Sequence, residues 1–299
     1  MRMPKPMLTG LSALAAMLAL PACAQPAPAA KDADPALWVV QDEDTTIYLF
    51  GTVHVLKPGL SWFDEAVKTA FDKSNTLVLE MVEPGEAEQQ RVIVAKAIDA
   101  DGPPLTQKLG EADRAAYVKA MGEIGVPTAN FEPFKPWMAA VSLAILPLQK
   151  MGYDPNSGAE KVLSAAARTA GKDVTGLETF EQQIGFFDAL PEEQQIKYLN
   201  STVKELPKFG ETMDKMVTEW SEGDADALGA LMNEGMKETP EIAEVLLYQR
   251  NARWATWIAE RMKQPGTVFV AVGAGHLAGD KSVIADLKTH KLTAKRVRY

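Results

Sequence analysis

Two stretches near opposite ends of the chain decide the fold: Ile47–His54, IYLFGTVH, and Val268–His276, VFVAVGAGH. Each is a run of apolar, strand-favouring residues that ends in the pattern Gly-x-x-His. A continuous apolar run of this kind is typical of a strand buried inside a parallel sheet. Because both copies share the strand and the motif, we expect two related halves of one sheet, with both histidines at its carboxyl edge.

Further strands and many helices surround these two stretches. Strands are predicted over Leu37–Gln41, Thr46–Gly51, Thr76–Met81, Asp173–Leu177, Gly266–Val272 and Thr293–Tyr299, the first two as a hairpin. Helices are predicted over about 61–73, 86–99, 111–124, 132–150, 157–170, 179–188, 191–205, 209–221, 224–234, 240–263 and 279–289. The sequence therefore predicts one α/β domain over residues 36–299, in which a small, mostly parallel central sheet carries a large helical insertion.

Composition excludes several classes of protein. The 299 residues are 46% hydrophobic and 24% charged, which is typical of a folded protein and not of a disordered or collagen-like chain. A formal net charge of -9, without a strong basic run, argues against nucleic acid as a partner. Cys23 is the single cysteine, so no intramolecular disulfide can form. No G-x-S-x-G, Walker A, G-x-G-x-x-G, H-E-x-x-H or C-x-x-C motif occurs.

The N-terminus has the pattern of a secretory signal peptide over residues 1–24, with basic residues, an apolar run and then small residues. Two cleavage modes stay open. Cleavage after Ala24 would leave Gln25 first, whereas Leu20–Cys23 resembles a lipobox, which would remove residues 1–22 and place a lipid on Cys23. Residues 25–35 are predicted as a disordered linker. We expect an exported, periplasmic protein. In the lipobox alternative, a lipid on Cys23 would be its one contact with a membrane and would anchor it to the outer membrane.

Four side chains that can bind a metal or move a proton follow predicted strands: His54, Glu80, Glu178 and His276. The order strand, helix, strand over 46–80 predicts that His54 and Glu80 end neighbouring parallel strands. Two imidazoles with one or two carboxylates suit Zn, Mn, Co or Fe(II) with an open water position. In the structural alternative the histidines are hydrogen-bonded within the fold and the glutamates cap helices. The third histidine, His290, is predicted to be exposed.

An arginine on the predicted helix 240–263 has an unusual position. Arg250 falls in an apolar stripe that includes Leu246 and Trp254, so its guanidinium should be buried. A buried charge needs an anionic partner. We expect Arg250 to form a salt bridge with Glu80 or Glu178, or to point into the pocket of the two histidines. The alternative is an arginine packed on tryptophan with its charge in water.

Taken together, these motifs resemble those of the TraB/GumN family, whose eukaryotic relatives include the Tiki membrane proteases. The resemblance runs over nearly the whole mature chain in the same order and spacing. It also covers PFKPW at Pro133–Trp137, the helix start SGAEKVL, GLETFEQQIGFFDALP at Gly176–Pro191, and the YQRNARW helix. It implies that His54 and His276 lie at the active centre with the strand-end acids, and that Arg250 and Asn251 match a supporting Arg-Asn motif.

What the family does is broader than one reaction. Resemblance to the Tiki proteins implies metal-dependent peptide cleavage. TraB relatives are associated with shutting down peptide pheromones, and GumN occurs with exopolysaccharide genes. The wider superfamily is similar to erythromycin esterases, which hydrolyse without an obligatory metal, and to the haem-binding ChaN proteins. The resemblance therefore implies an erythromycin-esterase-like or ChaN-like fold more firmly than a reaction. Unlike Tiki proteins, this chain has no predicted transmembrane anchor.

Three hypotheses follow from these observations. The first is an exported metal-dependent hydrolase, a peptidase acting on peptides or protein N-termini, in which His54, Glu80 and His276 bind Mn, Co or Zn. In it Glu178 orients or deprotonates water, and Arg250 assists. The second is a metal-free, esterase-type hydrolase with a histidine as general base. The third is a protein that binds haem or a peptide without turnover.

Overall fold

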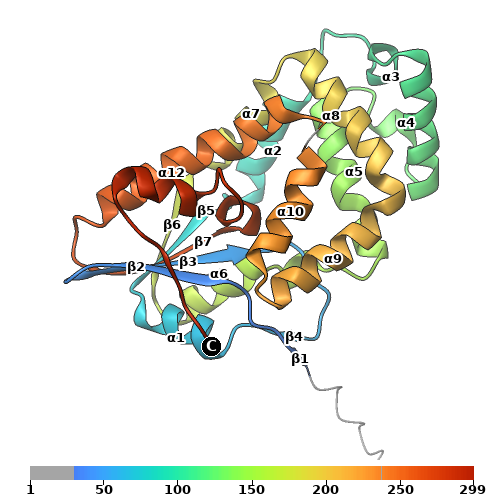
Figure 1. Cartoon of the computed structure of the whole chain (residues 1–299). Helices are drawn as coiled ribbons and strands as arrows, with labels where there is room; N and C mark the ends of the chain where they lie inside the picture. Colours follow the sequence, from blue (N-terminus) through green and yellow to red (C-terminus); the bar gives the residue numbers. More distant parts are fainter. Residues whose placement is uncertain (1–29, 237) are drawn as a thin grey trace, which may run out of the picture.

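The centre of the molecule is a six-stranded sheet of order β6-β5-β7-β3-β2-β8 (Figure 1). The computed structural model describes residues 30–236 and 238–299, so the predicted signal peptide, Cys23 and residues 25–29 of the predicted linker lie outside the described residues. The strands are β2 (Leu37–Gln41), β3 (Thr45–Thr52), β5 (Thr76–Met81), β6 (Asp173–Glu178), β7 (Gly266–Gly273) and β8 (Lys295–Arg296).

The four strands from β6 to β3 are parallel, and β2 pairs with β3 as the predicted antiparallel hairpin. Register between β3 and β7 runs from Thr45 opposite Gly266 to Thr52 opposite Gly273, so the two Gly-x-x-His motifs leave neighbouring strands. The expectation that His54 and Glu80 end neighbouring strands is wrong. Strand β7, from the far end of the chain, pairs with both β3 and β5 and separates them.

Alternation along the strands divides the core into two layers. Val268, Val270 and Val272 of β7 pack under α12 (Gln249–Arg261). The intervening Phe269 and Ala271 pack on the other face, against α1 (Glu65–Lys73) and α6 (Ala159–Thr169). Val78 of β5 lies on the α12 face, and because side chains alternate along a strand, Glu80 shares that face. The sheet thereby directs Glu80 toward α12.

Further helices form a region that lies mainly beyond the end toward which the β3 arrow points (Figure 1), and two of them also pack on the sheet core. They are α2 (Glu86–Ala97), α3 (Leu105–Lys108), α4 (Glu111–Ile124), α5 (Pro136–Lys150), α7 (Phe180–Asp188), α8 (Glu192–Glu205), α9 (Phe209–Ser221) and α10 (Ala225–Met236). Part of this region has its own apolar core, which includes Tyr117, Leu143 and Leu199. The α/β prediction, with a mostly parallel sheet and a helical region, is confirmed. None of the helices in residues 30–236 and 238–299 is long and apolar enough to cross a membrane.

Several elements differ from the sequence prediction. Lys31–Asp32, expected in the disordered linker, form β1, which pairs in parallel with β4 (Leu60–Ser61). Burial of Ala33 and a hydrogen bond from the Asp34 N–H to the Ser221 carbonyl (2.8 Å) hold this segment on the fold. At the other end, the strand expected over Thr293–Tyr299 is reduced to β8.

The helix predicted over 240–263 is not one regular helix. It consists of α11 (Pro240–Ala243), a π-helical turn over Glu244–Tyr248 and α12. A wide turn of this kind often lies beside a functional site. The helix predicted over 279–289 is shorter as well, with α13 (Val283–Asp286) followed by a 3-10 turn over Leu287–His290.

Candidate active site

Arg250 joins the two strand-end glutamates. Its Nη2 donates to Glu80 Oε2 at 2.6 Å and to Glu178 Oε2 at 2.8 Å, and its Nε donates to both oxygens of Glu178 at 3.0 and 3.1 Å. Only 9% of the Arg250 side chain is exposed. The prediction that Arg250 is buried and within salt-bridge reach of Glu80 or Glu178 is confirmed, with both acids as partners. Each buried charge therefore has its counter-charge.

Two further groups complete the surroundings of these carboxylates. Gln183 of α7 donates from Nε2 to Glu80 and to Glu178, at 3.1 Å in each case. The backbone N–H of Gly273 donates to Glu80 Oε1 at 2.7 Å. Burial by itself would raise the pKa of Glu80, but its contacts with His276 and Arg250 lower that pKa to about 2. Glu80 is accordingly a carboxylate at neutral pH.

His276 lies beside Arg250 in a fixed tautomer. Asn251 Nδ2 donates to the Lys281 carbonyl at 2.7 Å, which turns Asn251 Oδ1 toward His276 Nδ1 at 2.6 Å. The proton of the neutral ring is therefore on Nδ1, and the Nε2 lone pair accepts from Arg250 Nη1 at 3.2 Å. Burial, with a further contribution from Arg250, lowers the pKa of His276 to about 4. His276 is neutral at physiological pH.

His54 is held in a different way. Its Nδ1 lies 2.7 Å from Glu160 Oε1, which also accepts from the Thr52 hydroxyl at 2.5 Å. The negative charge of Glu160 raises the pKa of His54 to about 9, although 73% of the side chain is exposed. At neutral pH His54 is therefore a cation whose Nε2 faces away from Glu160.

Glu160 and Gln183 are site residues that the sequence interpretation missed. Both fall in stretches already singled out, SGAEKVL and GLETFEQQIGFFDALP, but nothing in a single sequence separates them from neighbouring polar residues. Glu160 reaches His54 because the start of α6 docks on the His54 loop. A methyl group built on Gly158 would lie 2.1 Å from the His54 carbonyl oxygen, so only glycine permits this approach.

Gly273 leaves a small space around which the candidate ligands converge. A methyl group built on it would lie 3.0 Å from Glu80 Oε1, 3.6 Å from His276 Cδ2 and 3.9 Å from His54 Nε2. The predicted gathering of His54, Glu80 and His276 at one edge of the sheet is thus seen in the geometry. Glu178 lies behind Arg250 as a second layer, and His290 lies apart, with Nε2 3.5 Å from the Thr256 hydroxyl.

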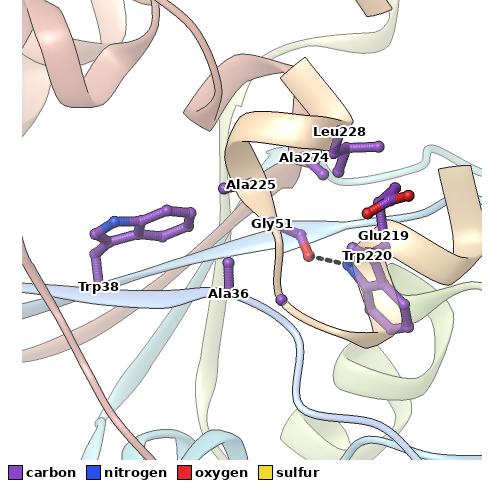
Figure 2. Close-up of a pocket in the computed structure, with 9 residues that line it drawn as sticks. Ala36, Trp38, Gly51, Glu219, Trp220, Ala225, Leu228 and Ala274 are labelled. Carbon is purple, nitrogen blue, oxygen red and sulfur yellow. Dashed lines mark hydrogen bonds between the residues drawn. The ribbon is translucent and has the colours of Figure 1, made fainter. Parts of the chain in front are cut away.

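Gly51, the glycine of the first motif, brings the two motifs together. Its carbonyl accepts a hydrogen bond from the Trp220 indole at 2.7 Å, in a small apolar pocket between the sheet and α9–α10 (Figure 2). A methyl group on Gly51 would lie 3.0 Å from the Ala274 Cα in the second motif. The missing side chain therefore lets the second motif pack directly on the first.

The side chains around Gly273 include the types of ligand that divalent cations use, two imidazoles and a carboxylate. Each histidine is held through Nδ1 and keeps Nε2 for the site, as metal-binding histidines commonly are. Within the described part of the chain, however, no three His, Cys, Asp or Glu side chains already form a metal-holding group. Arg250 donates to Glu80 Oε2 and to His276 Nε2, and Nε2 of the His54 cation carries a proton that a bound metal would have to displace. A cation would need these contacts to loosen.

Comparisons with known proteins find relatives over most of the chain. A protein of Treponema pallidum (strain Nichols), described only as an uncharacterized protein, is 21% identical over 273 residues, which cover 85% of this chain and 80% of the relative. No solved structure matches the chain significantly. The TraB/PrgY/gumN family model matches residues 36–296, nearly all of the chain that the structure describes. The chain therefore belongs to the TraB/PrgY/gumN family.

Proposed function

We propose that this chain is a metal-dependent hydrolase that cleaves peptides or protein N-termini. The observation that carries the proposal is the convergence of His54, His276 and Glu80 on the space in front of Gly273, with each imidazole held through Nδ1. The resemblance to the Tiki proteases supports a peptide as substrate. The pattern of residues 1–24 supports export to the periplasm, as a free or lipid-anchored protein.

Charge at the site supports a bound cation. Two carboxylates, those of Glu80 and Glu178, share the one buried guanidinium of Arg250, and a third, that of Glu160, lies against His54. The negative potential that raises the pKa of His54 would also favour Mn, Co or Zn at its Nε2. A cation bound by His54, His276 and Glu80 would supply a water of lowered pKa as the nucleophile.

The remaining side chains then have distinct tasks. Asn251 and Glu160 hold the two imidazoles with Nε2 toward the site. Glu178 is buried against Arg250 and Gln183, so we assign to it the orientation of Arg250 in place of direct contact with water. Arg250 supplies positive charge beside the site, which would stabilise negative charge on a substrate carbonyl oxygen.

Metal binding tests the proposal directly. The purified parent protein, His54→Ala and His276→Ala are incubated with Mn, Co or Zn, desalted, and analysed for bound metal. The matched control is His290→Ala, since His290 lies away from the site. We expect the parent and the control to retain metal and the two site variants to lose it. Equal metal content in all four proteins would overturn the role of the cation.

A metal-free hydrolase is the second candidate, and one observation favours it. The pKa values of the two imidazoles are displaced in opposite directions, to about 9 for His54 and about 4 for His276. Such a pair can divide acid and base roles, with His54 donating a proton to the leaving group and neutral His276 accepting one from water. Digestion of a random peptide library separates the candidates, because cleavage that survives exhaustive chelation supports the second.

A further inference from the structure

Arg253 lies at the rim of the site, and we propose that it binds a carboxylate group of the substrate. This inference rests on the proposed action on peptides and names a chemical feature of those peptides. The carboxylate can be the C-terminus of the peptide or an Asp or Glu side chain, because a guanidinium recognises the same planar group in either case.

The side chain of Arg253 is placed to meet a ligand. It is 50% exposed, whereas Arg250, three residues earlier on the same face of α12, is 9% exposed. Its guanidinium carbon lies 5.2 Å from the centroid of the Phe186 ring of α7, which is within range of a cation–π contact. The ring limits where the guanidinium can move, and the half-exposed side chain keeps N–H groups within reach of a ligand.

Among the described residues, the Arg253 guanidinium forms one long ion pair, with Glu178, and a cation–π contact. Its nearest acid is Glu178, with Oε1 at 3.8 Å from Nη2, which is beyond hydrogen-bond distance. Glu178 already accepts from Arg250 and Gln183, so its charge is largely satisfied without Arg253. Within residues 30–236 and 238–299, no hydrogen bond from the Arg253 guanidinium is formed. A carboxylate from outside would therefore find unoccupied donors.

Position in the sheet gives the spacing between this group and the reacting centre. Glu178 ends β6, which is separated from β7 by β5 alone, and Arg253 lies beside Glu178. Neighbouring strands lie about 4.8 Å apart, so the end of β6 is about 10 Å from the end of β7. An extended peptide covers that distance with about three residues. The recognised carboxylate should accordingly lie about three residues from the bond that is cleaved.

Peptide retention tests the inference without turnover. The probes are three mixtures of random hexapeptides made without Asp and Glu: one with a free C-terminal carboxylate, one amidated, and one amidated with Asp fixed at the fifth position. Each is passed over immobilised full-length protein in phenanthroline, a chelator that has no carboxylate to compete for Arg253. The bound peptide is then measured by mass spectrometry. The variants are Arg253→Gln and Arg253→Lys, and the matched control is Arg168→Gln, an exposed arginine near the far end of α6 from Glu160.

We expect the parent and Arg168→Gln to retain at least one carboxylate mixture about tenfold more than the plain amidated mixture. Whichever carboxylate mixture is enriched identifies the source of the group. Arg253→Gln should remove the preference, and Arg253→Lys should keep only part of it, because an ammonium lacks the planar fork. Equal retention of the three mixtures by the parent, or an undiminished preference in Arg253→Gln, would overturn the inference. A carboxylate preference in a protein that cleaves no peptide with any of the metals would support this binding site and contradict the proposed metal-dependent hydrolase.

Discussion

Asn251 determines which nitrogen of His276 carries the proton, through the 2.6 Å contact between Asn251 Oδ1 and His276 Nδ1. The amide cannot turn over freely, because its Nδ2 donates to the Lys281 carbonyl. The contact selects the neutral ring with its Nε2 lone pair toward Arg250. The Asn251 side chain of α12 therefore links the loop that carries Lys281 to the ring of His276, and this link fixes the tautomer of His276.

Replacing Asn251 by Asp should raise the pKa of His276. A carboxylate against Nδ1 favours the imidazolium, opposing the burial that holds this pKa at about 4. Titration of the histidine ring protons by NMR measures the change, with the pKa of His54 as the internal control. Asn251→Leu, which leaves the Lys281 carbonyl without its donor, should cost about 1–3 kcal/mol of stability. An unchanged pKa of His276 in Asn251→Asp would contradict the assigned contact.

Loss of the Arg250 guanidinium should destabilise the protein strongly. Arg250→Leu leaves two buried carboxylates, Glu80 and Glu178, without their counter-charge, and breaking such a cluster costs about 3–5 kcal/mol. Urea unfolding measures the cost, and Arg168→Leu on the exposed face of α6 should change stability by less than about 0.5 kcal/mol. Arg250→Lys should recover part of the stability, because one ammonium cannot reproduce the bonds to both acids. A cost under about 1 kcal/mol for Arg250→Leu would contradict the geometry.

Glu160 should make stability depend on pH on the alkaline side. The folded-state pKa of His54, about 9, exceeds its unfolded value near 6.5, so the pairing stabilises the fold fully below about pH 6.5 and is lost as pH rises through 9. Glu160→Gln removes the charge that raises this pKa. Its urea midpoint should therefore fall less than that of the parent between pH 6.5 and 9. Parallel pH profiles for the two proteins would show that Glu160 does not set the charge of His54.

Local sequence patterns predicted correctly those features that depend on a single helix or strand. Alternating and continuous apolar runs placed β5 at Thr76–Met81, and helical periodicity placed α4 at Glu111–Ile124. The apolar stripe around Arg250 predicted its burial, and the strand-end positions of Glu80 and Glu178 predicted its acidic partners. These site residues could be predicted because strand ends, the motif glycines and a charged residue in an apolar stripe can all be recognised in the local sequence.

Features that depend on how distant elements dock were not predictable. The insertion of β7 between β3 and β5 is a property of strand order, which no local pattern encodes. Glu160 meets His54 only because α6 packs against the His54 loop, and Gln183 reaches both acids only because α7 follows β6 closely. The π-helical turn before α12 also contacts the site, because the carbonyl of Leu246 within this turn accepts a hydrogen bond from Arg250 Nη1 at 3.0 Å.

The two motif glycines should respond differently to the same substitution. Gly51→Ala pushes a methyl group to 3.0 Å from the Ala274 backbone, which cannot move without shifting the second motif. We expect a loss of about 1–3 kcal/mol in urea unfolding, the usual cost of overpacking a core. Gly273 has φ −49°, so alanine fits its backbone, and the three atoms nearest to its methyl group belong to the side chains of Glu80, His276 and His54.

Gly273→Ala should therefore leave stability within about 1 kcal/mol of the parent while filling the space in front of the ligands. Under the proposed function, its affinity for Mn, Co or Zn should fall on the order of tenfold, as it does when groups next to metal ligands are changed. Calorimetric titration of both glycine variants with each metal, beside their urea curves, makes the comparison. Gly51→Ala, refolded at low temperature, should keep more of the metal affinity than Gly273→Ala. If Gly273→Ala binds metal with the affinity of the parent, the cation does not bind in the space at Gly273. The two histidines that converge there would then not be its ligands.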